Sequence, residues 1–107
     1  MLGTLTACRP DSIYFEIGNN SGGKLHNVRL TFPGDDVTFG TLEDSTYTAT
    51  SRHFNGPGDL AISYSTEDGH TYSSSGPHVT GNEKGEAKVR IDGSYTSFDT
   101  KFEEAQQ

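Results

Sequence analysis

Side chains that could carry out chemistry are sparse in this chain. The groups best able to bind a metal ion or act as a nucleophile are four histidines and one cysteine: His26, His53, His70, His78 and Cys8. No two histidines have H-x-x-x-H spacing, and none stands beside the cysteine. His70 and His78 flank a short polar segment, where they could approach each other across a sheet. Because exposed loop histidines are far commoner than metal ligands, we expect no metal and no cofactor.

Acidic pairs and serines are the remaining candidates for catalysis. The acidic pairs at residues 35–36 and 67–68 lie in expected turns, and neither fits the D-x-D-x-D-G pattern of a calcium loop. The serine run at residues 73–75 lacks the G-x-S-x-G context of a strained nucleophile turn. No nucleophile, base and orienting group come together in the sequence. We therefore expect no catalytic residues and no enzymatic activity.

The most specific motif is Leu5-Thr6-Ala7-Cys8, in which a leucine and two small or hydroxyl residues precede the cysteine. It resembles the lipobox of bacterial lipoproteins, and the chain is similar to small uncharacterised lipoproteins with a β-sandwich domain. In that family a peptidase cleaves before the cysteine, whose thiol carries a diacylglycerol. The resemblance implies lipidation of Cys8. Since Arg9 rather than aspartate follows, it also implies sorting to the outer membrane.

The segment before the cysteine leaves two interpretations open. A secretion signal has a charged region and an apolar run of roughly 7–15 residues, whereas the residues before Cys8 carry no charge. Residues 1–8 are therefore either the remnant of a lipoprotein signal or an N-terminal tail. In the second case Met1 is the true start, Cys8 is a free thiol and the protein is cytoplasmic.

A second resemblance lies in residues 74–87, SSGPHVTGNEKGEA, which contain Ser75-Gly76, Lys84-Gly85 and Ala87. This order resembles the inhibitory loop of the periplasmic and membrane-bound inhibitors of c-type lysozyme. In that family the serine and lysine reach the catalytic carboxylates of lysozyme, which implies inhibitory roles for Ser75 and Lys84. The alternative interpretation of this segment is a polar hairpin loop.

Charge limits the classes of partner. Eight Lys and Arg residues against fifteen Asp and Glu residues give a formal net charge of −7. Such a surface repels phosphate backbones, so we expect no nucleic-acid partner. It favours encounter with a basic protein. No run approaches the ~20 apolar residues of a spanning helix, so we expect membrane contact only through a lipid on Cys8.

Apolar residues alternate with polar ones in short segments separated by glycine-rich turns, the pattern of half-buried strands. Val28, Leu30 and Phe32 share one face of such a segment, and His26 begins that row. We expect residues 76–86 to form a loop and residues 70–75 to form an edge strand. The segments with strand-like alternation are 12–19, 25–32, 37–42, 45–54, 60–66, 70–75, 87–92 and 95–102.

These segments predict an all-β fold, a single antiparallel β-sandwich of about seven short strands that is immunoglobulin-like or transthyretin-like. We place the domain at residues 9–102 and a frayed tail at 103–107. Of the 107 residues only 30% are hydrophobic and none is tryptophan, so the core is lean. Because Cys8 has no second cysteine with which to form an intramolecular disulfide, the sandwich must rest on packing alone.

The sequence favours a non-enzymatic lipoprotein domain of the cell envelope, anchored in the outer membrane or periplasmic, that acts in binding or structure. One alternative is a periplasmic inhibitor or immunity protein against a basic enzyme such as a c-type lysozyme. Another is a cytoplasmic β-sandwich protein.

Overall fold

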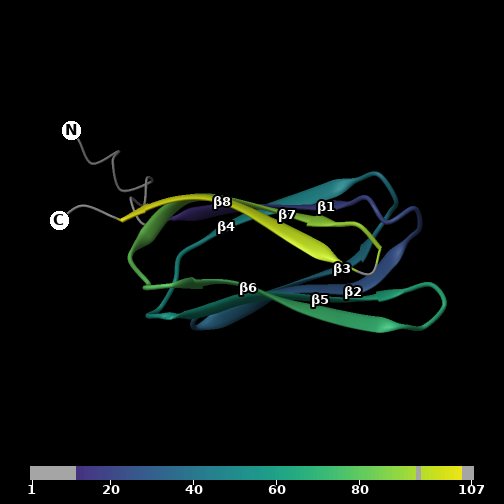
Figure 1. Cartoon of the computed structure of the whole chain (residues 1–107), viewed down its shortest axis with the longest axis horizontal. Helices are drawn as coiled ribbons and strands as arrows, with labels where there is room; N and C mark the ends of the chain where they lie inside the picture. The colour runs from purple at the N-terminus through teal and green to yellow at the C-terminus, as the bar shows by residue number, and fades with distance from the viewer. Residues whose placement is uncertain (1–11, 94, 105–107) are drawn as a thin grey trace.

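The structure, a computed structural model, describes residues 12–93 and 95–104. These residues form two four-stranded sheets that lie face to face, as Figure 1 shows. The strands are β1 (Ile13–Asn19), β2 (Leu25–Phe32), β3 (Asp35–Leu42), β4 (Tyr47–Arg52), β5 (Gly58–Thr66), β6 (Thr71–Val79), β7 (Glu83–Ile91) and β8 (Thr96–Glu104). The expected all-β sandwich is confirmed, with eight strands in the described ranges rather than seven.

Strand order defines the two layers. Sheet I has the order β4-β1-β7-β8, and sheet II has the order β3-β2-β5-β6. The expectation of a purely antiparallel sandwich is wrong at one place, because β1 and β7 pair in parallel. Five strands separate β1 from β7 along the chain, so no tight hairpin imposes an antiparallel direction on them.

The space between the sheets is filled by the apolar residues of each alternating pattern. Phe15 of β1 stacks on Phe32 of β2 with ring centroids 5.9 Å apart, and Phe54 lies 6.2 Å from Phe15. This cluster joins the two sheets at one end of the sandwich. The buried core consists of Ile13, Phe15, Ile17, Leu25, Val28, Leu30, Phe32, Leu42, Phe54, Leu60, Ile62, Tyr64, Val79, Ala87, Val89 and Ile91.

Strand β2 departs from strict alternation at its start. Asn27 has a φ of 54°, and the pairing of β2 with both neighbouring strands shifts register beside it. This is a β-bulge, in which one extra residue changes which side chains face inward. The placement of His26 at the head of the buried row is therefore wrong. Leu25 is fully buried there instead, and His26 is partly exposed.

The segment expected to form a loop is mostly strand. β6 continues to Val79 and β7 begins at Glu83, so only residues 80–82 connect them. Gly76 and Pro77 lie within β6 because this strand is at the edge of sheet II, where a register shift next to them leaves Pro77 unpaired. β6 is the edge strand that residues 70–75 predicted.

The end of the sandwich where β1 finishes is closed by one buried amide. Asn19 is fully buried. Its Nδ2 donates to the carbonyl oxygens of Gly23 at 2.8 Å and of Leu42 at 2.9 Å. Its Oδ1 accepts from the Ser21 amide at 3.0 Å and the Ser21 hydroxyl at 2.7 Å. Because Asn19 belongs to sheet I and Leu42 to sheet II, this side chain connects the two layers.

β1 begins and β8 ends at the same end of the sandwich, on the left in Figure 1. β8 runs to Glu104, which lies beyond the expected domain limit at residue 102. Across the described ranges no helix is long and apolar enough to cross a membrane.

We predict that Gly85→Ala destabilises the fold by about 2–5 kcal/mol. Gly85 has a φ of 128°, a conformation that side chains rarely adopt, and an added Cβ would collide with the carbonyl oxygen of Lys101 on β8. Urea unfolding followed by far-UV circular dichroism measures the change. Gly23→Ala is the matched control, because Gly23 has no positive φ and nothing lies within 4 Å of its Cβ position. Equal stability of the two variants would contradict this account.

Candidate functional site

The outer face of sheet I carries a regular grid of polar side chains. Register places Tyr47, Gly18, Arg90 and Ser97 in one row across β4, β1, β7 and β8. The adjacent row holds Ala49, Glu16, Lys88 and Asp99. Side chains two residues apart on a strand face the same way, so both rows project outward on the same surface.

A hollow of about 260 Å³ lies in this face, and Gly18 is part of its lining. Gly18 has no side chain, so the surface is low between Tyr47 on one side and Arg90 on the other. A Cβ built on Gly18 would lie 3.8 Å from the Tyr47 Cβ, so the site could accept a side chain without strain. The Gly18 hollow is lined by Glu16, Gly18, Asn20, Ser45, Thr46, Tyr47, Lys88, Val89, Arg90, Ser97 and Asp99.

The charges around the Gly18 hollow balance. Glu16 and Asp99 supply two carboxylates, and Lys88 and Arg90 supply two cations. Lys88 lies opposite Glu16 on one side and opposite Asp99 on the other. The lining is therefore formally neutral on a chain whose net charge is −7. A ligand in this hollow meets donors and acceptors of both signs without needing a net charge of its own.

Tyr47 is the aromatic element of the hollow. It is 66% exposed, whereas Tyr14, two rows away on the same face, is 41% exposed and does not line the hollow. A tyrosine combines an apolar ring with a polar hydroxyl, a pairing common at binding surfaces. No motif in the sequence marks these residues as a group. The signal available was a glycine at an outward position of an alternating strand, but its neighbours come from distant segments.

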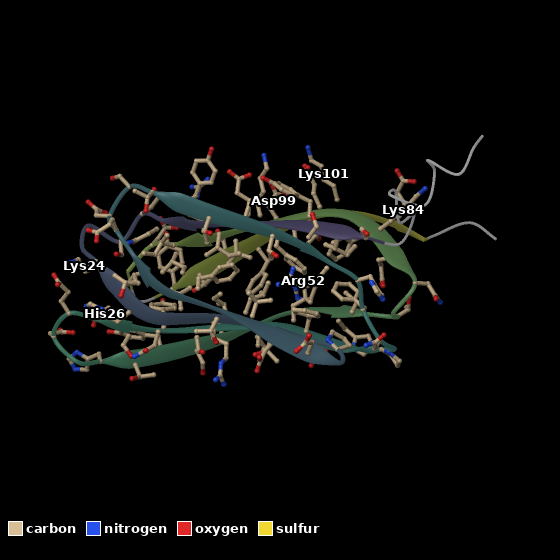
Figure 2. The ribbon with its side chains drawn as sticks, turned by 180° about the vertical axis from the view of Figure 1, so that it is seen from behind. Lys24, His26, Arg52, Lys84, Asp99 and Lys101 are labelled. Atoms are coloured by element: carbon tan, nitrogen blue, oxygen red, sulfur yellow. The ribbon has the colours of Figure 1, made fainter. Side chains whose placement is uncertain are left out.

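The two residues proposed for an inhibitory loop lie on different sheets. Ser75 is exposed on β6 of sheet II, opposite Ala61, and Lys84 is partly exposed on β7 of sheet I, opposite Glu103. Figure 2 places Lys84 at the end of the sandwich far from Lys24 and His26. The inhibitory role of Ser75 and Lys84 stays a prediction, and it now requires a ligand that contacts two strands rather than one loop.

The connection between β6 and β7 is held by Glu83. Its side chain is buried, and its carboxylate accepts the backbone amides of Thr80 at 2.8 Å and Gly81 at 3.0 Å. Burial alone raises the pKa of the Glu83 carboxyl. The hydrogen bonds from the backbone amides outweigh burial and hold this pKa below its usual value. Glu83 therefore stabilises the turn that carries the chain from sheet II to sheet I.

The histidines do not converge. His70 Nδ1 lies 3.0 Å from Asp68 Oδ2, and His78 Nδ1 lies 2.9 Å from Asp59 Oδ1. The suggestion that His70 and His78 approach each other is wrong, because β6 separates them by about 26 Å of extended chain. Within the two described ranges no three metal-binding side chains come together. Cys8, the proposed lipidation site, lies outside the described residues.

No known protein family and no curated protein matches this sequence. A solved NMR structure of a protein from Eubacterium rectale is similar in fold, with a TM-score of 0.59 over 91% of each chain. The sequences are 14% identical. This similarity supports the two-layered β fold and carries no information on activity.

We predict that Glu83→Gln lowers the free energy of unfolding by about 1–2 kcal/mol at neutral pH, because the backbone N–H groups of Thr80 and Gly81 lose their ionised hydrogen-bond acceptor. The pKa of Glu83 is lowered in the folded state, so its stabilisation is present above the usual value of 4.5 and disappears as pH falls through the folded value. The unfolding free energies of variant and parent should therefore differ at neutral pH and become similar well below pH 4.5, which denaturation at the two pH values measures.

The exposed Glu103→Gln on β8 removes the same charge without touching the turn, and it serves as the control. Its unfolding free energy should stay within about 0.5 kcal/mol of the parent at both pH values. A difference between Glu83→Gln and the parent that did not shrink in acid would rule out the ionised carboxylate as the stabilising acceptor.

Proposed function

We propose that this chain is a non-enzymatic binding domain of a bacterial cell-envelope lipoprotein, and that its Gly18 hollow binds a saccharide. The observation that carries the proposal is an exposed tyrosine ring beside a glycine floor, surrounded by balanced charges. We also propose that the sandwich is of the immunoglobulin-like or transthyretin-like type.

The chemistry of the lining favours a sugar over other small ligands. A pyranose ring has an apolar face of C–H groups that can lie on Tyr47, and hydroxyls around its rim. Glu16 and Asp99 accept hydrogen bonds from such hydroxyls, while Lys88 and Arg90 donate to them. Among the described residues, none of these four side chains forms an ion pair that would compete for such hydroxyls. A net-neutral lining also suits an uncharged ligand.

The size of the hollow is consistent with one or two sugar rings at the surface. Enclosed sites for drug-sized ligands measure roughly 300–1,000 Å³, and the Gly18 hollow is slightly smaller, at about 260 Å³. A shallow site on an open sheet face also leaves room for a polymer to continue past it at either side. Glycan chains of the cell envelope are ligands of this kind.

The envelope location rests on the lipobox-like motif. Only residues 9–12 separate Cys8 from Ile13 at the start of β1, so the two residues are at most about 18 Å apart when the chain is extended. A lipid on Cys8 would therefore keep the Ile13 end of sheet I close to the membrane. Gly18 lies toward the opposite end of β1, so the Gly18 hollow would lie at the end of the sandwich away from the bilayer, within reach of envelope polymers.

Inhibition of a c-type lysozyme remains the second proposal, carried only by the resemblance around Ser75 and Lys84. A standard lysozyme assay with the purified chain decides it, and Lys84→Ala should remove any inhibition found. The cytoplasmic alternative, with Cys8 as a free thiol, is decided by the mass measurement described below.

We predict that the chain binds oligomers of N-acetylglucosamine and isolated peptidoglycan. Titration of labelled protein, followed by ¹H–¹⁵N NMR, should shift the amides of Gly18, Tyr47 and Arg90. Tyr47→Ala should weaken binding about tenfold, since a stacked aromatic contact contributes roughly 0.5–1.5 kcal/mol beyond its buried area. Gly18→Val should also weaken binding, because the valine side chain fills the hollow. The backbone at Gly18 has no positive φ, so it can accept this side chain without strain.

Tyr14→Ala is the matched control, since Tyr14 is an exposed tyrosine on the same face outside the hollow. It should bind like the parent. Shifts confined to other surfaces, or equal loss in Tyr14→Ala and Tyr47→Ala, would overturn the assignment of the Gly18 hollow as the saccharide site.

We also predict that the protein expressed from its own locus, with its upstream DNA, begins at Cys8 and carries a diacylglycerol. Mass spectrometry of the intact protein measures the added lipid, and Cys8→Ser should prevent its attachment. An unmodified chain that retains Met1 would exclude lipidation and favour the cytoplasmic alternative.

A further inference from the structure

The four edge strands of the sandwich differ in how they resist pairing with another strand. An exposed edge offers unpaired backbone groups, and natural sheets usually blunt it with bulges, proline or short length. β3 has register shifts and a positive φ at Gly40, and β6 has a register shift beside Pro77. β4 is only six residues long.

β8 has no bulge, no proline and no shortened length, and the charged side chains that natural edges also use are here Asp99, Lys101 and Glu103 on its outward face. It is nine residues long and pairs with β7 without a register shift, from Thr96 opposite Ile91 to Glu104 opposite Glu83. It contains no proline and no glycine. Its outer edge is therefore a long and regular strand edge, which is suited to adding a further strand.

Two aromatic residues of β8 face the inside of the sandwich near this edge. Phe98 and Phe102 are only partly buried, although both pack against the core. The Phe98 ring lies directly over Gly76 of β6, where an added Cβ would come within 2.7 Å of the ring. Phe102 packs edge-on against Phe54, with ring centroids 6.3 Å apart. Both rings are partly exposed and would lose more water if a strand were added beside them.

The sequence of β8 is complementary to itself when read antiparallel. We propose that two copies of this chain pair through β8 around a two-fold axis at Thr100. In that register Asp99 lies opposite Lys101 of the second copy, and Lys101 lies opposite its Asp99. On the inner face, Phe98 lies opposite Phe102 of the second copy. Opposite charges and aromatic pairs directly across an antiparallel ladder are both stabilising.

The charge pattern of sheet I continues across this junction. Within one copy, Glu16, Lys88 and Asp99 alternate in sign along a row, and Glu86 lies opposite Lys101 in the next row. Joining the copies at Thr100 extends the first row through Lys101 and then Glu86 of the second copy. No two like charges lie directly opposite each other across the junction. Figure 2 shows Asp99 and Lys101 projecting from the same outward side of the sheet.

This self-complementarity identifies the occupant of the edge as a second copy rather than an unrelated peptide. A C2 interface requires that each residue meet a suitable partner on the same strand of the other copy, and β8 meets this requirement at the two charged and two aromatic positions. One strand pair buries less than the roughly 1,200 Å² of a stable interface. We therefore expect a dimer that dissociates on dilution.

Disulfide trapping tests the register directly. In a Cys8→Ser background, Thr100→Cys places the two new thiols opposite each other at the axis, about 5 Å apart between Cα atoms, which a disulfide can span. Oxidised glutathione should then produce a covalent dimer on a non-reducing gel. Thr96→Cys is the matched control on the same strand and face, because the two copies of residue 96 would lie about 27 Å apart.

Charge reversal tests the energetics by sedimentation equilibrium from micromolar to millimolar protein. Asp99→Lys puts like charges opposite each other on both sides of the axis and should weaken the dimer about tenfold. Combining Asp99→Lys with Lys101→Asp should restore it. Asp36→Lys on edge strand β3 makes the same charge change and should have no effect. A chain that stays monomeric at millimolar concentration, or equal cross-linking of both cysteine variants, would overturn the proposal.

Discussion

The layer of apolar side chains between the two sheets is the constraint on which the rest of this structure depends. Each strand has one apolar face, and neither sheet could remain in water without the other to cover it. This requirement fixes which side chains point inward, and the period of two then fixes which point outward. The rows that form the Gly18 hollow exist because Phe15, Ile17, Ala87 and Val89 on the same strands are needed inside.

Where the chain crosses between the sheets, buried polar side chains hold the backbone by hydrogen bonds rather than by apolar packing. Asn19 bonds to Leu42 across the layers, and Glu83 binds the amides of Thr80 and Gly81 at the last crossing. Both side chains are buried and both have partners, so neither carries the cost of an unsatisfied group. Because the domain has few hydrophobic residues in its core, Asn19 and Glu83 help to fix the positions at which the chain passes between the two sheets.

One strand connects the two surface features proposed for this protein. Asp99 of β8 lines the Gly18 hollow and also lies at the centre of the self-complementary edge. A dimer through β8 would join the two outer faces into one continuous surface that carries two hollows. For a polymeric ligand, two linked sites raise the apparent affinity without any new contact. A weak saccharide site and a weak dimer would therefore reinforce each other.

The sequence by itself determined the strands, because alternation is local and requires only that one face be buried. It predicted that Val28, Leu30 and Phe32 share one face of their strand and that residues 70–75 form an edge strand, and the structure confirms both. Tertiary structure decided what depends on distant partners. The bulge at Asn27 buried Leu25 in the position expected for His26. The parallel pairing of β1 with β7, and the placement of Gly18 between Tyr47 and Arg90, also depend on strands that are distant in sequence. No periodic signal encodes such pairings, since register is set by packing between strands that lie far apart in the chain.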